Sequence, residues 1–270
     1  MTAHYGLPSP TALAARRCIR IFWLGQSNAQ TQCDNYSELT KWAGPWSNPL
    51  MRAYRRSIYL GSDLTEAWRA AAPRQVGVTN GVTGLPGADL VCMRQLIKAG
   101  YNVELIEFTQ GSTSCYTDWQ KTEATCYTRA TSAWSSAIST HPEPPSTIVP
   151  IIVWIQGESD AQTDQMADAY QTKVAQLFSD LRTDIPAIAS AMLFVCKLHP
   201  NCVLGGGVGG SRNTKIRNAQ AAYAATDSAK ITLVETSDLT LNNGDALHYD
   251  QTSQITLGRR LSTAIGAYAL

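Results

Sequence analysis

The sequence lacks an excess of charge of either sign. Its 270 residues include 22 basic and 21 acidic side chains, which leaves a formal net charge of +1 at pH 7. Nucleic acids and anionic membranes attract proteins mainly through clustered positive charge. The composition therefore gives no electrostatic reason to expect a nucleic acid or a membrane as a partner.

Long apolar runs and an export signal are also lacking. No apolar stretch reaches the length of about 20 residues that a transmembrane helix needs. Arg16 and Arg17 follow a weakly apolar segment, whereas a secretory signal peptide places its positive charge first. These features leave the localisation open between an intracellular protein, a processed mature form and a module of a larger secreted or virion protein. The oligomeric state is equally open.

The sequence has no Cys-x-x-Cys pair and no histidine cluster of the kind that binds zinc, so we expect no metal and no cofactor. Its seven cysteines are an odd number, so at least one thiol stays free if every disulfide is internal. The pairs Cys115/Cys126 and Cys196/Cys202 lie in loop-like segments. Each pair could close a small ring, although spacing alone does not fix the connectivity.

The sequence does contain enough apolar residues, 44% of the total, for one large core. Five short apolar segments predict buried strands at 19–24, 103–108, 148–155, 187–195 and 231–235. Helical patterns lie at 87–99, 125–140, 164–181, 213–225 and 251–269. Strands that alternate with helices predict an α/β fold in three α/β/α layers, with a mostly parallel five-stranded sheet.

No repeat or linker divides the chain, so we expect a single domain over residues 1–270, with residues 1–18 as an N-terminal extension. Two irregular excursions, 30–86 and 197–212, are expected to lie near the site. The second contains the glycine-rich run 205–210, which lacks the Gly-Lys-Ser/Thr ending of a phosphate-binding loop. This favours a loop over the site rather than a phosphate cradle.

A Gly-Gln-Ser-Asn motif follows the first predicted strand and carries Ser27. Open α/β folds build their sites at the carboxyl ends of parallel strands. Gly25 and Asn28 tolerate the unusual backbone angles of a sharp turn there. Asp245 and His248 stand three positions apart near the C-terminal end. Together with the serine they supply the nucleophile, base and orienter of acyl transfer.

Each of these assignments has a simpler alternative. Ser27 could cap the helix that follows it. Asp250 could take the place of Asp245 as the orienter. The other histidines (His4, His141 and His199) have no acid at a similar spacing after a strand, which favours His248 as the base.

Two further blocks follow predicted strands: Gln-Gly-Ser-Thr at 110–113 and Trp-Ile-Gln-Gly-Glu-Ser-Asp at 154–160. The blocks together resemble the SGNH/GDSL hydrolases. More closely, they resemble the sialate O-acetylesterase and carbohydrate esterase family 6 branch, in which Gly-Gln-Ser-Asn and Trp-x-Gln-Gly-Glu are typical. The resemblance covers about residues 19–268 and includes Ile-Arg-Asn-Ala-Gln at 216–220. It implies a flavodoxin-like fold, a Ser/His/Asp serine esterase, an acetylated carbohydrate as substrate and no cofactor.

The tetrahedral oxyanion of such a reaction needs fixed hydrogen-bond donors. Candidates are the backbone N–H groups of Ser27 and Gly111 and the side-chain amide of Gln156. The broad superfamily places an asparagine in the third block, so Gln156 departs from it but agrees with the branch. The alternative is that Gln156 is a structural amide that ties two strand ends together.

Glu158 is an acid within the same block. A buried glutamate must be paired, and Arg217 is a candidate partner, which would make Glu158 and Arg217 supporting residues. The alternative is a direct catalytic role for Glu158. Trp42, Trp46 and Trp119 could stack on a sugar ring, although packing is the default for each of them.

Two other functions remain as alternatives to a carbohydrate O-acetylesterase. A lipase or thioesterase could use a related site, but the sequence shows no long apolar segment that resembles a lid or an acyl groove. A non-catalytic carbohydrate-binding module of a phage tail or cell-surface assembly would not require a complete serine, acid and histidine set.

We expect ester hydrolysis by this protein to survive treatment with EDTA, because no residue cluster in the sequence has metal-ligand spacing. Rates measured before and after dialysis against the chelator test this. Complete loss that one divalent ion restores would reveal a metal site that the sequence does not show.

Overall fold

The computed structural model describes residues 17–30, 51–59, 62–63, 68–70, 87–122, 125–141, 147–204, 210–242 and 246–269. Its centre is a parallel sheet formed by β1 (Cys18–Gly25), β5 (Asn102–Gln110), β6 (Ile148–Ile155), β7 (Met192–Cys196) and β8 (Ile231–Val234). These strands are neighbours in the order β5-β1-β6-β7-β8. Numbered along the chain, this is the 2-1-3-4-5 order of flavodoxin-like folds. The predicted fold class is confirmed.

The sheet extends further than the sequence analysis predicted. The segment 30–86, expected to be irregular, contributes β2 (Met51–Tyr59), β3 (Ser62–Asp63) and β4 (Trp68–Ala70). β2 runs parallel to β5, and the two short strands pair with β2 in antiparallel fashion. The sequence of β2 contains three arginines among its nine residues, so it has no continuous apolar run to reveal it.

The strand predicted at 187–195 begins later than expected. A short 3₁₀ helix, η3 (Pro186–Ile188), occupies the first part, and β7 starts at Met192. Proline at the first position of η3 fixes a φ angle that suits a helical turn and leaves no N–H for a sheet. The apolar side chain of Ile188 is buried from this turn rather than from a strand.

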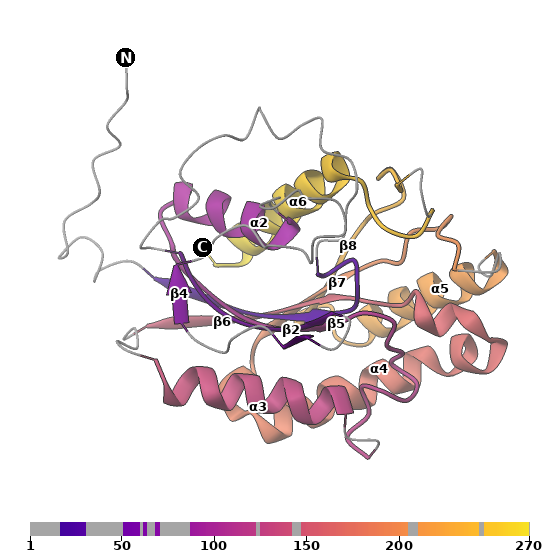
Figure 1. The fold of residues 1–270 in the computed structure, drawn as a ribbon, viewed down its shortest axis with the longest axis horizontal. Helices are drawn as coiled ribbons and strands as arrows, with labels where there is room; N and C mark the ends of the chain where they lie inside the picture. Colours follow the sequence, from indigo (N-terminus) through magenta and orange to yellow (C-terminus); the bar gives the residue numbers. More distant parts are fainter. Residues whose placement is uncertain are drawn as a thin grey trace.

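In the described part of the chain, five α-helices cover the two faces of the sheet (Figure 1). α2 (Ala88–Lys98) and α6 (Gln251–Ala269) lie on one face. The other face carries α3 (Thr125–Ser139), α4 (Asp164–Asp184) and α5 (Ser211–Thr226). All five agree with the predicted helices to within three residues at each end. None of the described helices has both the length and the apolar character needed to cross a membrane.

Alternate side chains of β1 point to opposite faces of the sheet and pack into two separate apolar cores. Phe22 packs in the core beneath α3, α4 and α5, while Trp23 packs in the core beneath α2 and α6. Trp119 is also fully buried, with its ring 4.8 Å from that of Trp154, so the interpretation that Trp119 stacks on a sugar is wrong. The other two tryptophans considered for that role, Trp42 and Trp46, lie outside the described residues.

Neither of the two disulfides that the sequence left possible forms. Cys115, Cys126, Cys196 and Cys202 are all buried, unbridged thiols. Burial raises the pKa of the Cys126 thiol to about 12, and the pKa of Cys115, Cys196 and Cys202 is raised for the same reason. Because the thiolate is the reactive form, these cysteines are expected to be chemically inert in the folded protein.

The helices α2 and α6 approach each other closely at Gly258. A Cβ atom at this position would lie 2.5 Å from the carbonyl oxygen of Ala88 and 2.7 Å from Cβ of Val91. By contrast, the nearest atom to a Cβ at Gly266, in the same helix, is a methyl carbon of Leu96 at 3.9 Å. Close packing against α2 therefore requires glycine at position 258, whereas position 266 has room for a larger side chain.

We expect Gly258→Ala to lower the free energy of unfolding by about 1–3 kcal/mol, because the added methyl group overpacks a backbone contact. Gly266→Ala is the matched control and should raise it by about 0.5–1 kcal/mol, because alanine loses less chain entropy in a helix. Urea unfolding of the two variants and the parent measures both changes. Equal midpoints for the two variants would contradict the close α2–α6 packing.

Candidate active site

Three of the four sequence blocks meet at one edge of the sheet. In the strand register Gly25 lies beside Thr109 of β5 and beside Ile155 of β6, so β1, β5 and β6 end at nearly the same level. Ser27 follows β1, Gly111 follows β5, and the third block follows β6. Parallel pairing therefore brings Ser27 near residues that lie 84 positions (Gly111) and 129 positions (Gln156) further along the sequence.

The turn that carries Ser27 depends on Gly25. Its φ angle is 149°, and a Cβ atom there would collide with the carbonyl oxygen of Ile155 and lie 2.8 Å from Cβ of Ala29. Ser27 itself is 6% exposed. The expectation that Asn28 uses an unusual backbone angle is wrong, because positive φ among the described non-glycine residues occurs elsewhere. The alternative in which Ser27 caps a helix concerns residues beyond 30, which lie outside the described part.

The segment around His248 is held directly against this turn. The side-chain nitrogen of Asn28 donates to the carbonyl of Leu247 at 3.2 Å, and the backbone N–H of Tyr249 donates to the Asn28 side-chain oxygen at 3.0 Å. The N–H of Asn242 donates to the carbonyl of His248 at 2.7 Å. The residue next to the proposed nucleophile therefore contacts both neighbours of the proposed base.

Two acids, Asp245 and Asp250, are candidates for the residue that orients His248, and the structure describes only Asp250. Asp245 lies outside the described residues. Asp250 accepts a hydrogen bond from the backbone N–H of Ser253 at 2.7 Å and so caps the first turn of α6. This capping bond gives Asp250 a structural role, which weakens the alternative in which it orients His248.

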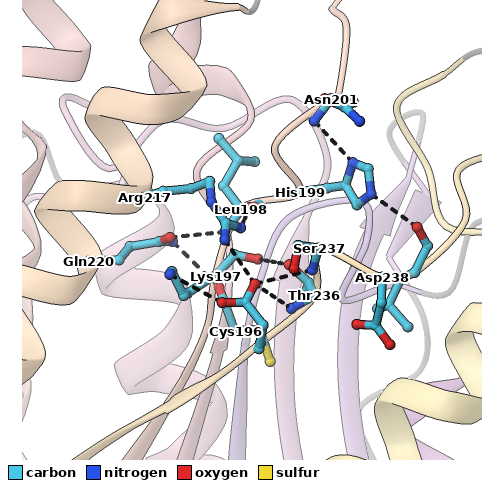
Figure 2. Close-up of polar contacts among 12 residues, drawn as sticks. Cys196, Lys197, Leu198, His199, Asn201, Arg217, Gln220, Thr236, Ser237 and Asp238 are labelled. Carbon is cyan, nitrogen blue, oxygen red and sulfur yellow. Dashed lines mark hydrogen bonds and ion pairs between the residues drawn. The ribbon is translucent and has the colours of Figure 1, made fainter.

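Two of the competing histidines, His141 and His199, are engaged elsewhere, while His4 lies outside the described residues. His141 lies 2.6 Å from Glu104, which also forms a buried ion pair with Arg20. The ring of His199 accepts a hydrogen bond from the N–H of Asn201 at 3.2 Å (Figure 2), and its other nitrogen lies 3.0 Å from the carbonyl of Leu239. Burial lowers the pKa of His199, and both ring nitrogens contact the main chain, which gives this imidazole a structural role.

Gly111 passes directly beside the serine. A Cβ atom at Gly111 would lie 3.8 Å from Cβ of Ser27. The next residue, Ser112, has a φ angle of 58° and is exposed, so the chain bends sharply here. Asp160 holds the continuation of this loop, because its carboxylate accepts the N–H groups of Cys115 at 2.8 Å and Tyr116 at 2.9 Å.

Asp160 is a site residue that the sequence analysis missed. It is fully buried, and burial raises its pKa to about 7 despite the hydrogen bonds that favour its charged form. Its place in the third block, two positions after Glu158, was the available signal. Among the described residues, no group of three or more histidine, cysteine or acidic side chains could hold a metal ion.

The amide of Gln156 is already committed to protein partners. Its nitrogen lies 2.5 Å from the Asp160 carboxylate, 3.0 Å from the carbonyl of Thr113 and 3.2 Å from the side-chain oxygen of Gln26. Its oxygen accepts from the hydroxyl of Tyr170 at 3.2 Å. An amide has two N–H bonds, and here three acceptors face them. The geometry favours the structural interpretation of Gln156 over a donor in the oxyanion hole.

Glu158 does not pair with Arg217, so that prediction is wrong. Arg217 binds Glu235 at 2.8 Å and donates to the carbonyl of Leu198 (Figure 2). Glu158 is 3% exposed and instead accepts a hydrogen bond from the Asn28 side chain at 2.6 Å. Burial raises the pKa of Glu158, and the nearby His248 acts in the opposite direction. A carboxylate thus lies within electrostatic reach of the proposed base.

Fold and site together define a class of protein. A flavodoxin-like sheet with a serine turn after its first strand, a glycine loop after the next and a histidine loop before the last helix is the arrangement of the SGNH hydrolases. A family model of carbohydrate esterases, described as sialic acid-specific acetylesterases, matches residues 19–267. The chain belongs to this family.

Solved structures show the same fold. A protein of Arabidopsis thaliana is 19% identical, with a TM-score of 0.66, and the match covers 92% of this chain and 98% of that one. A carbohydrate acetylesterase from Xanthomonas citri is 17% identical, with a TM-score of 0.62, and the match covers 93% of this chain and 57% of that one. A carbohydrate acetylesterase from Sinorhizobium meliloti is 13% identical, with a TM-score of 0.51, and the match covers 94% of this chain and all (100%) of that one. No curated protein sequence matches this chain.

We expect Gln156→Ala to lower the melting temperature, while kcat falls by less than the roughly 10²–10³-fold that loss of an oxyanion donor costs. The reason is that the amide joins Thr113, Gln26 and Asp160 inside the protein. Gln165→Ala is the control, since Gln165 is exposed and makes one side-chain bond, to the hydroxyl of Tyr116. A large fall in kcat with an unchanged melting curve would return Gln156 to the oxyanion hole.

Proposed function

We propose that this protein is a serine esterase that removes O-acetyl groups from a carbohydrate through an acetyl-enzyme intermediate. The observation that carries the proposal is the contact of Asn28, the neighbour of Ser27, with the backbone on both sides of His248. It ties the turn that carries Ser27 to the backbone that carries His248, at the carboxyl edge of the sheet. Family membership supports esterase chemistry on a carbohydrate.

In the proposed first step, Oγ of Ser27 attacks the carbonyl carbon of the acetyl ester, and His248 takes the hydroxyl proton. The resulting tetrahedral intermediate collapses by breaking the bond between the acetyl carbon and the sugar oxygen. His248 then returns its proton to that oxygen, and the sugar leaves as an alcohol. A free hydroxyl is a poor nucleophile at neutral pH, so a base is required.

The second step restores the enzyme. Water attacks the acetyl-serine while His248 accepts one of its protons, and the second intermediate releases acetic acid, which ionises in solution. The proton then passes from His248 back to the Ser27 oxygen. In both steps the negative charge develops on the acetyl oxygen, which we propose is met by the backbone N–H groups of Ser27 and Gly111. The proximity of these two residues supports the assignment.

Two acids assist the base in this proposal. Asp245 would bind the imidazole ring and hold the tautomer in which its other nitrogen faces the serine. Glu158 lies near His248, and the electrostatic interaction with this histidine opposes the burial that raises the pKa of Glu158. An ionised Glu158 near His248 would therefore favour the imidazolium that forms in each transition state.

We expect Ser27→Ala to abolish ester hydrolysis while the protein stays folded, because an alanine side chain fits where a small serine is buried. A fluorophosphonate probe should label the parent on Ser27 and should fail to label the variant. Labelling of another residue, or an active Ser27→Ala protein, would contradict the assignment of the nucleophile.

Substrate class needs a separate measurement on the parent. p-Nitrophenyl esters of increasing chain length, run beside acetylated xylan and acetylated sialic acid, should show hydrolysis confined to acetyl esters and acetate release from at least one of the sugars. A preference for long chains would identify a lipase or thioesterase. A protein that binds these sugars but hydrolyses nothing would be a carbohydrate-binding module.

A further inference from the structure

Asn28 is almost completely buried, with 1% of its surface exposed, and its carboxamide makes contacts to two other parts of the chain. The nitrogen donates to the carbonyl of Leu247 at 3.2 Å and to the carboxylate of Glu158 at 2.6 Å. The oxygen accepts from the N–H of Tyr249 at 3.0 Å. A single side chain thus joins three segments. They are the turn that carries Ser27 (the serine turn, 25–30), the third block (154–160), and the described residues around His248 (240–242 and 246–250), called the histidine loop.

The orientation of this amide is set by its surroundings. Two oxygen acceptors face its nitrogen, and one N–H donor faces its oxygen. A flipped amide would place its oxygen against the oxygens of Leu247 and Glu158 and its nitrogen against the N–H of Tyr249, and would lose all three bonds. The carboxamide therefore acts as a fixed peptide-like unit between the two peptide groups that flank His248.

The histidine loop also has hydrogen bonds within itself. The N–H of Asn242 donates to the carbonyl of His248 at 2.7 Å, and the N–H of Asp250 donates to the carbonyl of Thr240 at 3.1 Å. These bonds join described residues on either side of positions 243–245. The bonds of Asn28 connect the residues around His248 to the turn that carries Ser27.

The backbone of Asn28 is anchored in turn. Its carbonyl accepts a hydrogen bond from the Gln254 side chain of α6 at 3.2 Å, and the carbonyl of Ala29 accepts one from the buried indole of Trp23 at 3.1 Å. A side chain on a fixed backbone can transmit position accurately, which is the requirement for a residue that aligns two reacting groups.

From this geometry we propose that Asn28 is a positioning residue, which sets the distance and angle between His248 and Ser27 by binding the main chain on both sides of the histidine. The proposal rests on the serine-esterase function proposed above. It assigns Asn28 no contact with the substrate. Loss of Asn28 should therefore slow the activation of the serine and leave substrate binding nearly unchanged.

The test compares Asn28→Ala with Asn213→Ala. Asn213 is a matched control, because it is also a buried asparagine that binds two backbone groups, the carbonyls of Pro200 and Cys202 at 3.0 and 2.8 Å. Both variants lose buried hydrogen bonds of the same kind, and both should have lower melting temperatures. The difference lies in which loop is released.

The first measurement is the rate of fluorophosphonate labelling of Ser27, well below the melting temperature of each variant. We expect Asn28→Ala to label roughly 10²-fold more slowly than the parent, the scale of loss for a reacting group displaced by about 1 Å. With p-nitrophenyl acetate, kcat should fall by a similar factor while KM stays within about threefold. Asn213→Ala should keep the parent's labelling rate.

Asn28→Asp provides a second variant in case the alanine protein does not fold. Aspartate keeps an acceptor for the N–H of Tyr249 but has no N–H for the carbonyl of Leu247, so labelling should again be slower than in the parent. A labelling rate equal to the parent's in folded Asn28→Ala or Asn28→Asp would overturn the proposal. Equal slowing in Asn213→Ala would overturn it as well, because a general loss of stability would then explain the effect.

The failure of this proposal can be told apart from the failure of the proposed function. If the parent labels on Ser27 but releases no acetate from any acetylated sugar, the substrate class is wrong, and the comparison of labelling rates still decides the role of Asn28. If the parent does not label on Ser27, both proposals fall together.

Discussion

A carboxylate that is removed from water needs hydrogen bonds, and the structure around the site depends on how Asp160 obtains them. Its donors are the N–H groups of Cys115 and Tyr116 and the amide of Gln156. Two of them come from the loop after β5 and the third from the end of β6. Since a buried charge without these donors would be costly, the two loops must stay together. The strand register places Gly111 beside Ser27, and the bonds of Asp160 hold the loop that continues from Gly111.

Buried polar side chains also connect the other loops of the site. Where the strands end, the regular backbone ladder also ends, and the loops have to be joined by other means. Three buried side chains provide the connections: Asn28 binds the histidine loop, Gln156 binds the carbonyl of Thr113, and Asp160 binds the loop that follows. Each bonds main-chain atoms of a distant segment. Beyond the strand ends, amide and carboxylate groups therefore add to strand pairing and apolar packing in connecting the loops of the candidate site.

Much of this fold can be predicted from the sequence because its strands are buried on both faces and read as continuous apolar runs. β1 is the clearest example, with every residue buried. β2 cannot be predicted in this way, because its three arginines interrupt any apolar pattern. It is a strand because it pairs with β5, and this contact between distant segments leaves no local signal in the sequence. The serine turn and the third block can be found from their motifs, but the pairing of Glu158 cannot. Which polar group reaches it depends on the packing of loops, and Asn28, rather than Arg217, does so.

The burial of Asp160 and Glu158 makes the stability of the fold depend on pH. Burial raises the pKa of Asp160 from 3.8 to about 7, so the folded state holds a proton more tightly there than the unfolded chain does. The contribution of this group to stability is then greatest at low pH and declines as the pH rises from about 4 to about 7. Glu158 shifts in the same direction, although Asn28 and His248 oppose the shift. The two acids also fix the positions of their hydrogen-bond donors. Asn28, which donates to Glu158, belongs to the turn that carries Ser27, and Cys115 and Tyr116, which donate to Asp160, belong to the loop that carries Gly111.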